Sequence, residues 1–339
     1  MTSGAETVDL RELRGLADSG RFREVLARLG ALPVRAVEER TPLALLAAEA
    51  HGRLGELSAA AHWAELALAA SRERGEPHAE LRARNYQGLI ALRQGSVDVA
   101  EGHLNAALGM ARAQSDAGLE ARCLNNLGVI ANLRGDREQA LADYQLALAA
   151  YQQAGVMRGM AETHHNLAIT WRDLGDHQRA LAAAEQAVRL ARTVEDETLV
   201  GLTLAGRAAI HLQQTDSSLA AAELERAADA YRRVQFESGL AEVWRLQAAV
   251  IRLKGNLPGA VDLLHRAADL ARERGSADTL ADIERDLGGA LAVAGDTAGA
   301  REAWARASAG YRRLGAVRAA DEVAALIPSV TSLPPASKP

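Results

Sequence analysis

The stretch Leu124–Tyr151 reads LNNLGVIANLRGDREQALADYQLALAAY and is one copy of a unit that recurs along the chain. Its turn residue, Gly135, returns at steps of 40 residues in both directions without insertion or deletion. The seven turn positions are Gly55, Gly95, Gly135, Gly175, Thr215, Gly255 and Gly295. A fixed period of this size is typical of proteins built from stacked repeats.

A short polar residue follows most of these turns, namely Ser96, Asp136, Asp176, Asp216, Asn256 and Asp296, with Glu56 as the weak copy. Glycine suits the left-handed end of one helix, and Asp, Asn or Ser caps the start of the next by accepting its free backbone N–H groups. Each turn therefore predicts the end of a helix A and the start of a helix B. Pro42 and Pro258 fit first helical turns, and Pro77 fits a loop between repeats.

Three columns of small residues accompany the turns. Alanine stands five and twelve residues after every turn, as in Ala140 and Ala147, and glycine or alanine stands seven residues before, as in Gly128. Small side chains at these spacings predict helices whose axes approach closely. Larger apolar residues nine after the turn, such as Tyr144 and Trp304, fill the remaining space.

Around one turn, these columns and their neighbours resemble the signature of the tetratricopeptide repeat. The residues that carry the resemblance are Leu124, Leu127, Gly128, Ala140 and Tyr144. The long spacing resembles the variety found in kinesin light chains and LGN-type scaffolds. The resemblance implies an all-α, right-handed α-solenoid of antiparallel helix pairs, a tetratricopeptide superhelix whose A helices line a concave groove. Because 40 residues exceed the usual ~34, we expect helix B to be longer by about a turn and a half.

The predicted organisation has five parts. We expect a disordered N-terminus (1–8), a degenerate N-terminal helical pair around Gly20 (9–38), seven repeats (41–315), a capping helix (316–327) and a disordered tail (328–339). A terminal unit needs only one partner face, which explains why the first pair lacks the alanine columns.

Composition excludes several classes of function. The net charge of −5 argues against a nucleic-acid partner, and the lone Cys123 excludes an intramolecular disulfide and a cysteine-based zinc site. His164 and His165 are adjacent, so on a helix they diverge by about 100° and cannot share a metal. Without a phosphate loop or a catalytic motif, we expect no cofactor, no metal and no enzyme activity. Without a signal sequence or a membrane-length apolar run, we expect a cytoplasmic protein with no membrane partner.

The resemblance implies that residues thirteen, ten, six, three and two positions before each turn face the groove. The candidate peptide-binding residues are Arg82, Asn85, Leu89, Arg93, Arg122, Asn125, Val129, Asn132, His165, Ile169, Arg172, Arg245, Arg252 and Arg285. Arginine can clamp a carboxylate and asparagine can both donate to and accept from a peptide backbone. The alternative is that Asn126 and Asn166, on the flank of the same helices, satisfy backbone groups and that the arginines are solvated, in a chain whose basic residues are nearly all arginine.

We therefore predict a non-enzymatic adaptor or scaffold that grips an extended protein or peptide segment, acidic or with a free C-terminus. One alternative is a peptide-sensing regulator that resembles bacterial pheromone receptors and acts in trans. Another is a self-assembling homo-oligomeric scaffold, and the oligomeric state stays open. RNA binding is weaker, because the chain is acidic and aromatics make up only 3% of it.

Overall fold

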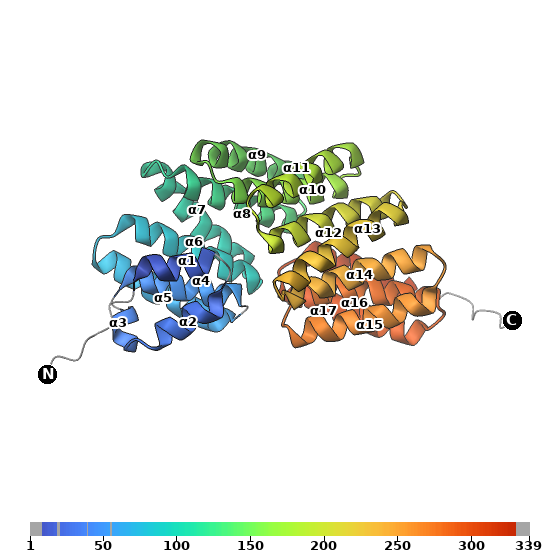
Figure 1. Cartoon of the computed structure of the whole chain (residues 1–339). Helices are drawn as coiled ribbons and strands as arrows, with labels where there is room; N and C mark the ends of the chain where they lie inside the picture. Colours follow the sequence, from blue (N-terminus) through green and yellow to red (C-terminus); the bar gives the residue numbers. More distant parts are fainter. Residues whose placement is uncertain (1–8, 19–20, 39, 55, 330–339) are drawn as a thin grey trace. The chain divides into compact units, whose positions relative to one another are not determined.

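The computed structural model describes residues 9–18, 21–38, 40–54 and 56–329, and this part of the chain contains nineteen helices and no strand (Figure 1). Consecutive helices pack as pairs, which confirms the predicted all-α architecture. The expected disordered N-terminus at 1–8, residues 330–339 of the expected disordered tail (328–339), and the turn residues Gly20 and Gly55 lie outside the described residues. The first two residues of that expected tail, Pro328 and Ser329, belong instead to the last helix, α19 (Leu326–Ser329).

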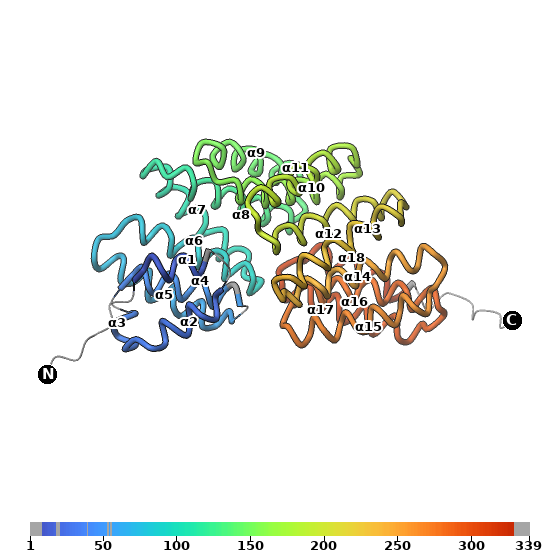
Figure 2. The backbone as a smooth tube through the Cα atoms, in the orientation of Figure 1, coloured from blue at the N-terminus to red at the C-terminus, as the bar shows by residue number. Residues whose placement is uncertain are grey.

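The chain divides after Cys123 into an N-terminal and a C-terminal unit, and the division falls within α8. Figure 2 labels α8 on the backbone trace. The helices are α1 Leu10–Asp18, α2 Phe22–Gly30, α3 Val34–Glu38, α4 Thr41–Arg53, α5 Leu57–Glu73, α6 Pro77–Arg93, α7 Val97–Ala113, α8 Ala117–Arg134, α9 Arg137–Ala154, α10 Met157–Asp173, α11 His177–Thr193, α12 Glu197–Gln213, α13 Ser217–Arg233, α14 Glu237–Leu253, α15 Leu257–Glu273, α16 Ala277–Val293, α17 Thr297–Arg313, α18 Val317–Ala324 and α19 Leu326–Ser329. Even-numbered helices from α4 to α16 are the A helices of the repeats, and the odd-numbered helices that follow them are the B helices.

A left-handed residue ends nearly every helix of the repeats, and these residues stand 20 positions apart. They are Gly75, Gly95, Ser115, Gly135, Gly155, Gly175, Glu195, Thr215, Gln235, Gly255, Gly275, Gly295 and Gly315. The helices from α5 to α17 are consequently 17 or 18 residues long, whether A or B. The expectation that helix B alone is longer was wrong, because the turns between repeats keep the same step as the turns within them.

The predicted caps explain where the B helices begin. The carboxylates of Asp136, Asp176, Asp216 and Asp296 each accept the backbone N–H three residues later, and Asn256 does the same with its amide oxygen. Ser96 makes no such bond. Pro77 is the first residue of α6 rather than part of a loop. A backbone N–H at this position would have no partner within the helix, so proline loses no hydrogen bond there.

Glycine seven residues before a turn makes room for a large side chain on the partner helix. A Cβ built on Gly128 would lie 2.6 Å from the Tyr144 ring, and one on Gly288 would lie 2.4 Å from the Trp304 ring. A Cβ on Gly88 would likewise lie 2.7 Å from Leu104. The glycine and the bulky residue therefore form one packing unit within each of these repeats.

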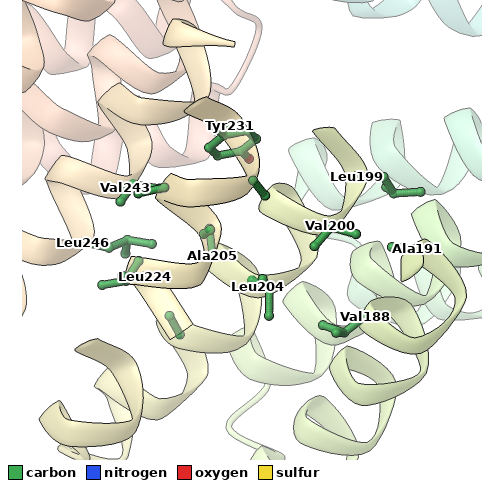
Figure 3. Close-up of a cluster of buried hydrophobic side chains, with 14 of the residues drawn as sticks. Val188, Ala191, Leu199, Val200, Leu204, Ala205, Leu224, Tyr231, Val243 and Leu246 are labelled. Carbon is green, nitrogen blue, oxygen red and sulfur yellow. The ribbon is translucent and has the colours of Figure 1, made fainter. Parts of the chain in front are cut away.

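A second packing unit joins neighbouring repeats of the C-terminal unit. Tyr151 packs on Gly159 and Tyr231 on Gly239, eight positions further along in both cases. In the intervening repeat the small and large partners are exchanged, because Ala191 shares a buried cluster with Leu199 (Figure 3). The same arrangement thus returns at every second repeat, and it reflects size matching between helices.

Among the described residues, no helix combines the length and apolar character that crossing a membrane requires.

Candidate peptide-binding face

In the C-terminal unit, one group of predicted site residues belongs to a network of amides and hydroxyls between α8 and α10. Oδ1 of Asn125, a residue only 7% exposed, accepts hydrogen bonds from Oγ1 of Thr163 (3.0 Å) and Nδ2 of Asn166 (3.1 Å). Two turns further along, Asn132 Nδ2 donates to Oγ1 of Thr170 (2.7 Å). We call these five residues the amide network. Its hydrogen bonds tie two neighbouring A helices together.

Asn132 also ties α8 to its own B helix. Its Nδ2 donates to the Tyr144 hydroxyl (3.2 Å), and its Oδ1 accepts from Nη1 of Arg137 (3.0 Å). Burial raises the pKa of Tyr144 above its ordinary value, so this hydroxyl stays protonated. The Asn132 amide is therefore occupied by partners within the protein.

A second group belongs to a network of charges between α14 and α16. Arg245, whose side chain is 11% exposed, donates to Asp286 (2.5 Å) and to Glu242 (2.7 Å). Arg285 contacts Asp286 (3.0 Å), Asp282 (3.2 Å) and the Tyr311 hydroxyl (3.1 Å), and that hydroxyl bonds Asp282. We call these six residues the charged network.

Opposing effects set the charge of Asp286. Burial alone would raise its pKa, but the charges and hydrogen bonds of Arg245 and Arg285 hold the pKa below its ordinary value. The carboxylate is therefore ionised at neutral pH. Since Arg245 and Arg285 are compensated by acidic neighbours on the same helices, they offer little net positive charge to a ligand.

The N-terminal unit presents its candidates differently. Asn85 is buried, and its Oδ1 accepts a long contact from Sγ of Cys123 (3.8 Å), a thiol whose pKa burial raises to about 12. Arg93 is exposed and donates to the Gly52 carbonyl (2.5 Å). Arg82 is half-buried and Arg122 is exposed.

Arg82 and Arg122 come from successive A helices and act on the same hydroxyl. Burial and the carboxylate of Glu49 raise the pKa of Tyr86, whereas the positive charges of Arg82 and Arg122 oppose that rise. Both guanidinium groups are therefore within electrostatic range of Tyr86, and the half-buried Leu89 stands one turn further along α6. These two arginines are thus predicted site residues from neighbouring repeats that act on one side chain.

The remaining candidates lie on α8, α10 and α14. The half-buried ring of His165 packs on Gly206 of α12, and burial, followed by the charge of Arg172, lowers its pKa to about 4. His165 is therefore neutral at pH 7, and Arg172 pairs with Asp173 (2.8 Å). Val129 and Ile169 are half-buried, and Arg252 is exposed.

The sequence analysis did not predict the contacts between repeats that hold these candidates in place. Asn125 contacts Asn166, and Arg245 contacts Asp286, and in both pairs the residues are 41 positions apart. The signal was a polar residue ten positions before one turn followed by a matching polar residue nine positions before the next. Glu242 and Asp282 each stand thirteen positions before a turn, at a predicted groove position, whereas Thr163 stands at none of these positions.

No group of three or more His, Cys, Asp or Glu side chains in the described part of the chain is placed to hold a metal ion.

Comparisons with known proteins agree with this architecture. Models of the tetratricopeptide repeat match residues 79–153 and 161–196. No curated protein sequence matches the chain. Three solved structures with similar folds illustrate the likeness.

A Rap protein complexed with competence and sporulation factor is 14% identical with a TM-score of 0.64, over 95% of this chain and 96% of that one. NprR in complex with its cognate peptide NprX is 15% identical with a TM-score of 0.60, over 98% and 100%. Aspartyl phosphate phosphatase F from Bacillus subtilis is 13% identical with a TM-score of 0.55, over 100% and 98%. At these identities the likeness concerns the fold. The repeat models and the helix pairs together identify the chain as a tetratricopeptide-repeat protein.

Proposed function

We propose that this protein is a non-enzymatic adaptor or scaffold that holds an extended peptide segment against its A helices. The observation that carries the proposal is that Arg82 and Arg122, from successive A helices, both act electrostatically on Tyr86. Two guanidinium groups from neighbouring repeats can each clamp a carboxylate through paired N–H bonds. Leu89 adds an apolar contact beside them. An acidic segment or a free C-terminus suits this arrangement.

The spacing of the helices limits which acidic segments would fit. Packed helices lie about 8–10 Å apart, and a peptide in the extended polyproline II conformation advances about 3.1 Å per residue and presents every third side chain on the same face. Arg82 and Arg122 would thus meet carboxylates about three residues apart. A peptide with acidic residues at that spacing should bind better than one with adjacent acidic residues.

A second candidate is a peptide-sensing regulator that acts on another protein. Solved structures of this fold include a Rap conjugation gene regulator in complex with the Phr* peptide and NprR in complex with its cognate peptide, which supports a peptide as the ligand under either candidate. A sensor would change shape on binding, whereas a scaffold would stay rigid. Small-angle scattering with and without a bound peptide separates the two. We place the protein in the cytoplasm, where the single buried thiol of Cys123 would stay reduced.

The first experiment uses immobilised ten-residue peptides that carry two glutamates at varied spacing, with either a free or an amidated C-terminus. We expect the best-bound peptides to have glutamates three residues apart. The double variant Arg82→Glu with Arg122→Glu should weaken the binding of these peptides at least tenfold, because the new glutamates of the protein would repel the glutamates of the peptide.

The matched control is Arg74→Glu with Arg313→Glu, which makes the same change in net charge at exposed positions on B-helix ends. This control should bind as the unmodified protein does, and both variants should keep their helical circular dichroism. Equal loss in the two double variants would show a non-specific charge effect and would overturn the proposed site. Failure of every peptide to bind would overturn the proposed function.

A further inference from the structure

A cavity of about 490 Å³ lies between α11 and α12 in the C-terminal unit. Its lining residues are Glu185, Val188, Arg189, Arg192 and Thr193 of α11 and Arg207 of α12. The volume is within the ~300–1,000 Å³ that small-molecule sites usually occupy. Half of the lining residues are arginines, and we call this the arginine cavity.

The arginine cavity is separate from the proposed peptide-binding face. On α12 the predicted groove positions include Ala205 and Ala209, and Arg207 is two residues from each. Two residues correspond to about 200° around a helix, so Arg207 leaves α12 on the opposite side. The other lining residues belong to α11, a B helix. A ligand here would not compete directly with a peptide on the A helices.

A buried ion pair forms one end of the cavity. Nη2 of Arg207 donates to Oε1 of Glu223 (2.8 Å), and the two side chains are only 19% and 10% exposed. Arg207 Nε and Glu223 Oε2 are buried and have no hydrogen-bond partner among the described residues. The pair thus uses one of the two parallel bonds that a guanidinium and a carboxylate can make. Glu223 fixes the Arg207 side chain but leaves part of its donor capacity unused.

Arg192 belongs to a column of arginines near the ends of the B helices, and in other repeats their charge is compensated. Arg72 pairs with Glu80 and Arg112 with Glu120, each eight positions later, while Arg232 pairs with Asp229 and Arg272 with Asp269, each three positions earlier. At Arg192 both partner positions have changed. Val200 stands eight positions later and Arg189 three positions earlier, and Arg192 has no ion-pair partner in the part of the chain that the structure describes.

Arg189 adds a like charge where two other repeats have an acid, Asp229 and Asp269. Arginines three residues apart on a helix repel each other. Arg189 also has no ion-pair partner among the described side chains. Burial is the larger cause of the lowered pKa of His164, and the positive charge of Arg189 is the second cause. The repeat that departs from the pattern of compensated arginines is thus the one with the cavity.

We propose that the arginine cavity binds a small molecule through an anionic group, a phosphate or a carboxylate, held by Arg189 and Arg192 with Arg207 behind them. Val188 supplies an apolar wall and also belongs to the buried cluster shown in Figure 3. Glu185 can accept a hydrogen bond from a hydroxyl or ammonium group of the same ligand. The lining therefore suits a compact polar molecule such as a sugar phosphate or a small hydroxy acid.

The test measures binding of inorganic phosphate, acetate and glycerol 3-phosphate to the full chain by calorimetry, with chloride at matched ionic strength as the reference. Phosphate and acetate distinguish the two anionic groups, and glycerol 3-phosphate adds hydroxyls for Glu185. We expect at least one probe to bind in preference to chloride. Arg189→Asp should weaken that probe at least tenfold, because it gives Arg192 the partner that Arg232 and Arg272 already have.

Arg189→Asp copies the residue found in two other repeats, so we expect it to fold normally, and thermal unfolding checks this. The matched control is Arg232→Gln, which removes a compensated arginine from the same column one repeat further along and should leave binding unchanged. The proposal is overturned if no probe binds better than chloride, or if Arg189→Asp binds as tightly as the unmodified chain. Because no peptide is present, failure here says nothing about the proposed peptide-binding face.

Discussion

The amide network and the charged network occupy equivalent places in two parts of the C-terminal unit. In both, a residue ten positions before a turn contacts a residue nine positions before the next, Asn125 with Asn166 and Arg245 with Asp286. One contact joins neutral amides and the other joins opposite charges. The same backbone spacing thus accepts either solution for joining two A helices.

The difference decides what each region can offer to a ligand. In the charged network every arginine has acidic neighbours, so an anionic peptide would have to displace Asp282, Asp286 or Glu242. In the amide network the polar groups bond each other and leave no net charge. The positive charge of the A helices is therefore least compensated at arginines outside these two networks, for example at the exposed Arg252. Three changes would break or sharpen this comparison.

The largest effect should come from Asp286→Ala. It removes the acceptor shared by Arg245 and Arg285 and leaves the mostly buried Arg245 with Glu242 alone. Breaking a buried ion pair costs about 3–5 kcal/mol, and Asp286 is 30% exposed, so we expect a loss of about 3 kcal/mol in the free energy of unfolding. Urea titration followed by circular dichroism measures it. The surface variant Asp269→Ala should lose less than about 0.5 kcal/mol, and a similar loss in both would contradict the special role of the charged network.

A smaller effect should appear on acidification, in separate pH ranges for two groups. The pKa of His165 is about 4 in the folded chain and 6.5 ordinarily, so the unfolded chain binds the proton first and stability falls as the pH drops from 6.5 to 4. We expect this to amount to about 2 kcal/mol, after allowance for partial exposure. Asp286 has a lowered pKa, so its contribution is lost only below pH 3.8.

Urea midpoints between pH 7 and pH 4 check this prediction. His165→Gln should flatten the profile in that range, whereas the exposed His265→Gln should not. An unchanged profile in His165→Gln would show that the imidazole is already solvated in the folded chain.

The smallest effect should come from Asn125→Ala. The variant leaves Asn166 without its acceptor, whereas Thr163 retains the Gly159 carbonyl at 2.8 Å. A net loss of about 1 kcal/mol is expected for such a hydrogen bond, and it should not depend on salt concentration, unlike the loss in Asp286→Ala. The exposed Asn105→Ala is the control for urea titration. A loss as large as that of Asp286→Ala would mean that the neutral network carries equal weight.

The fold could be predicted from the sequence because its turns leave local signals. Gly135 and Asp136 report a left-handed helix end and a cap, and both act within a few residues. Equal helix lengths were harder to predict, because the turns between repeats use Ser115, Glu195 and Gln235 in the left-handed conformation as well as glycine. Those residues carry no distinctive turn signal.

The candidate site was less predictable because contacts between repeats decide the role of each polar side chain. Asn85 and Asn125 have the composition of peptide-binding residues, yet Asn85 is buried and Asn125 bonds the next helix. Arg245 and Arg189 both stand on exposed helix positions in the sequence pattern, and only the structure shows that one is compensated and the other is not. Periodicity predicts the helix face on which a side chain lies, but it does not predict which residue of the neighbouring helix that side chain contacts.

The matched sizes of Tyr151 with Gly159, and of Ala191 with Leu199, have a consequence for how such a chain can change length. Deleting a single repeat would bring a tyrosine against a leucine, or an alanine against a glycine, and would leave either an overlap or a void. Deleting two consecutive repeats would restore the original match. Insertions and deletions in this protein should therefore be tolerated in blocks of four helices. The unit of duplication or deletion is then a pair of repeats rather than a single repeat.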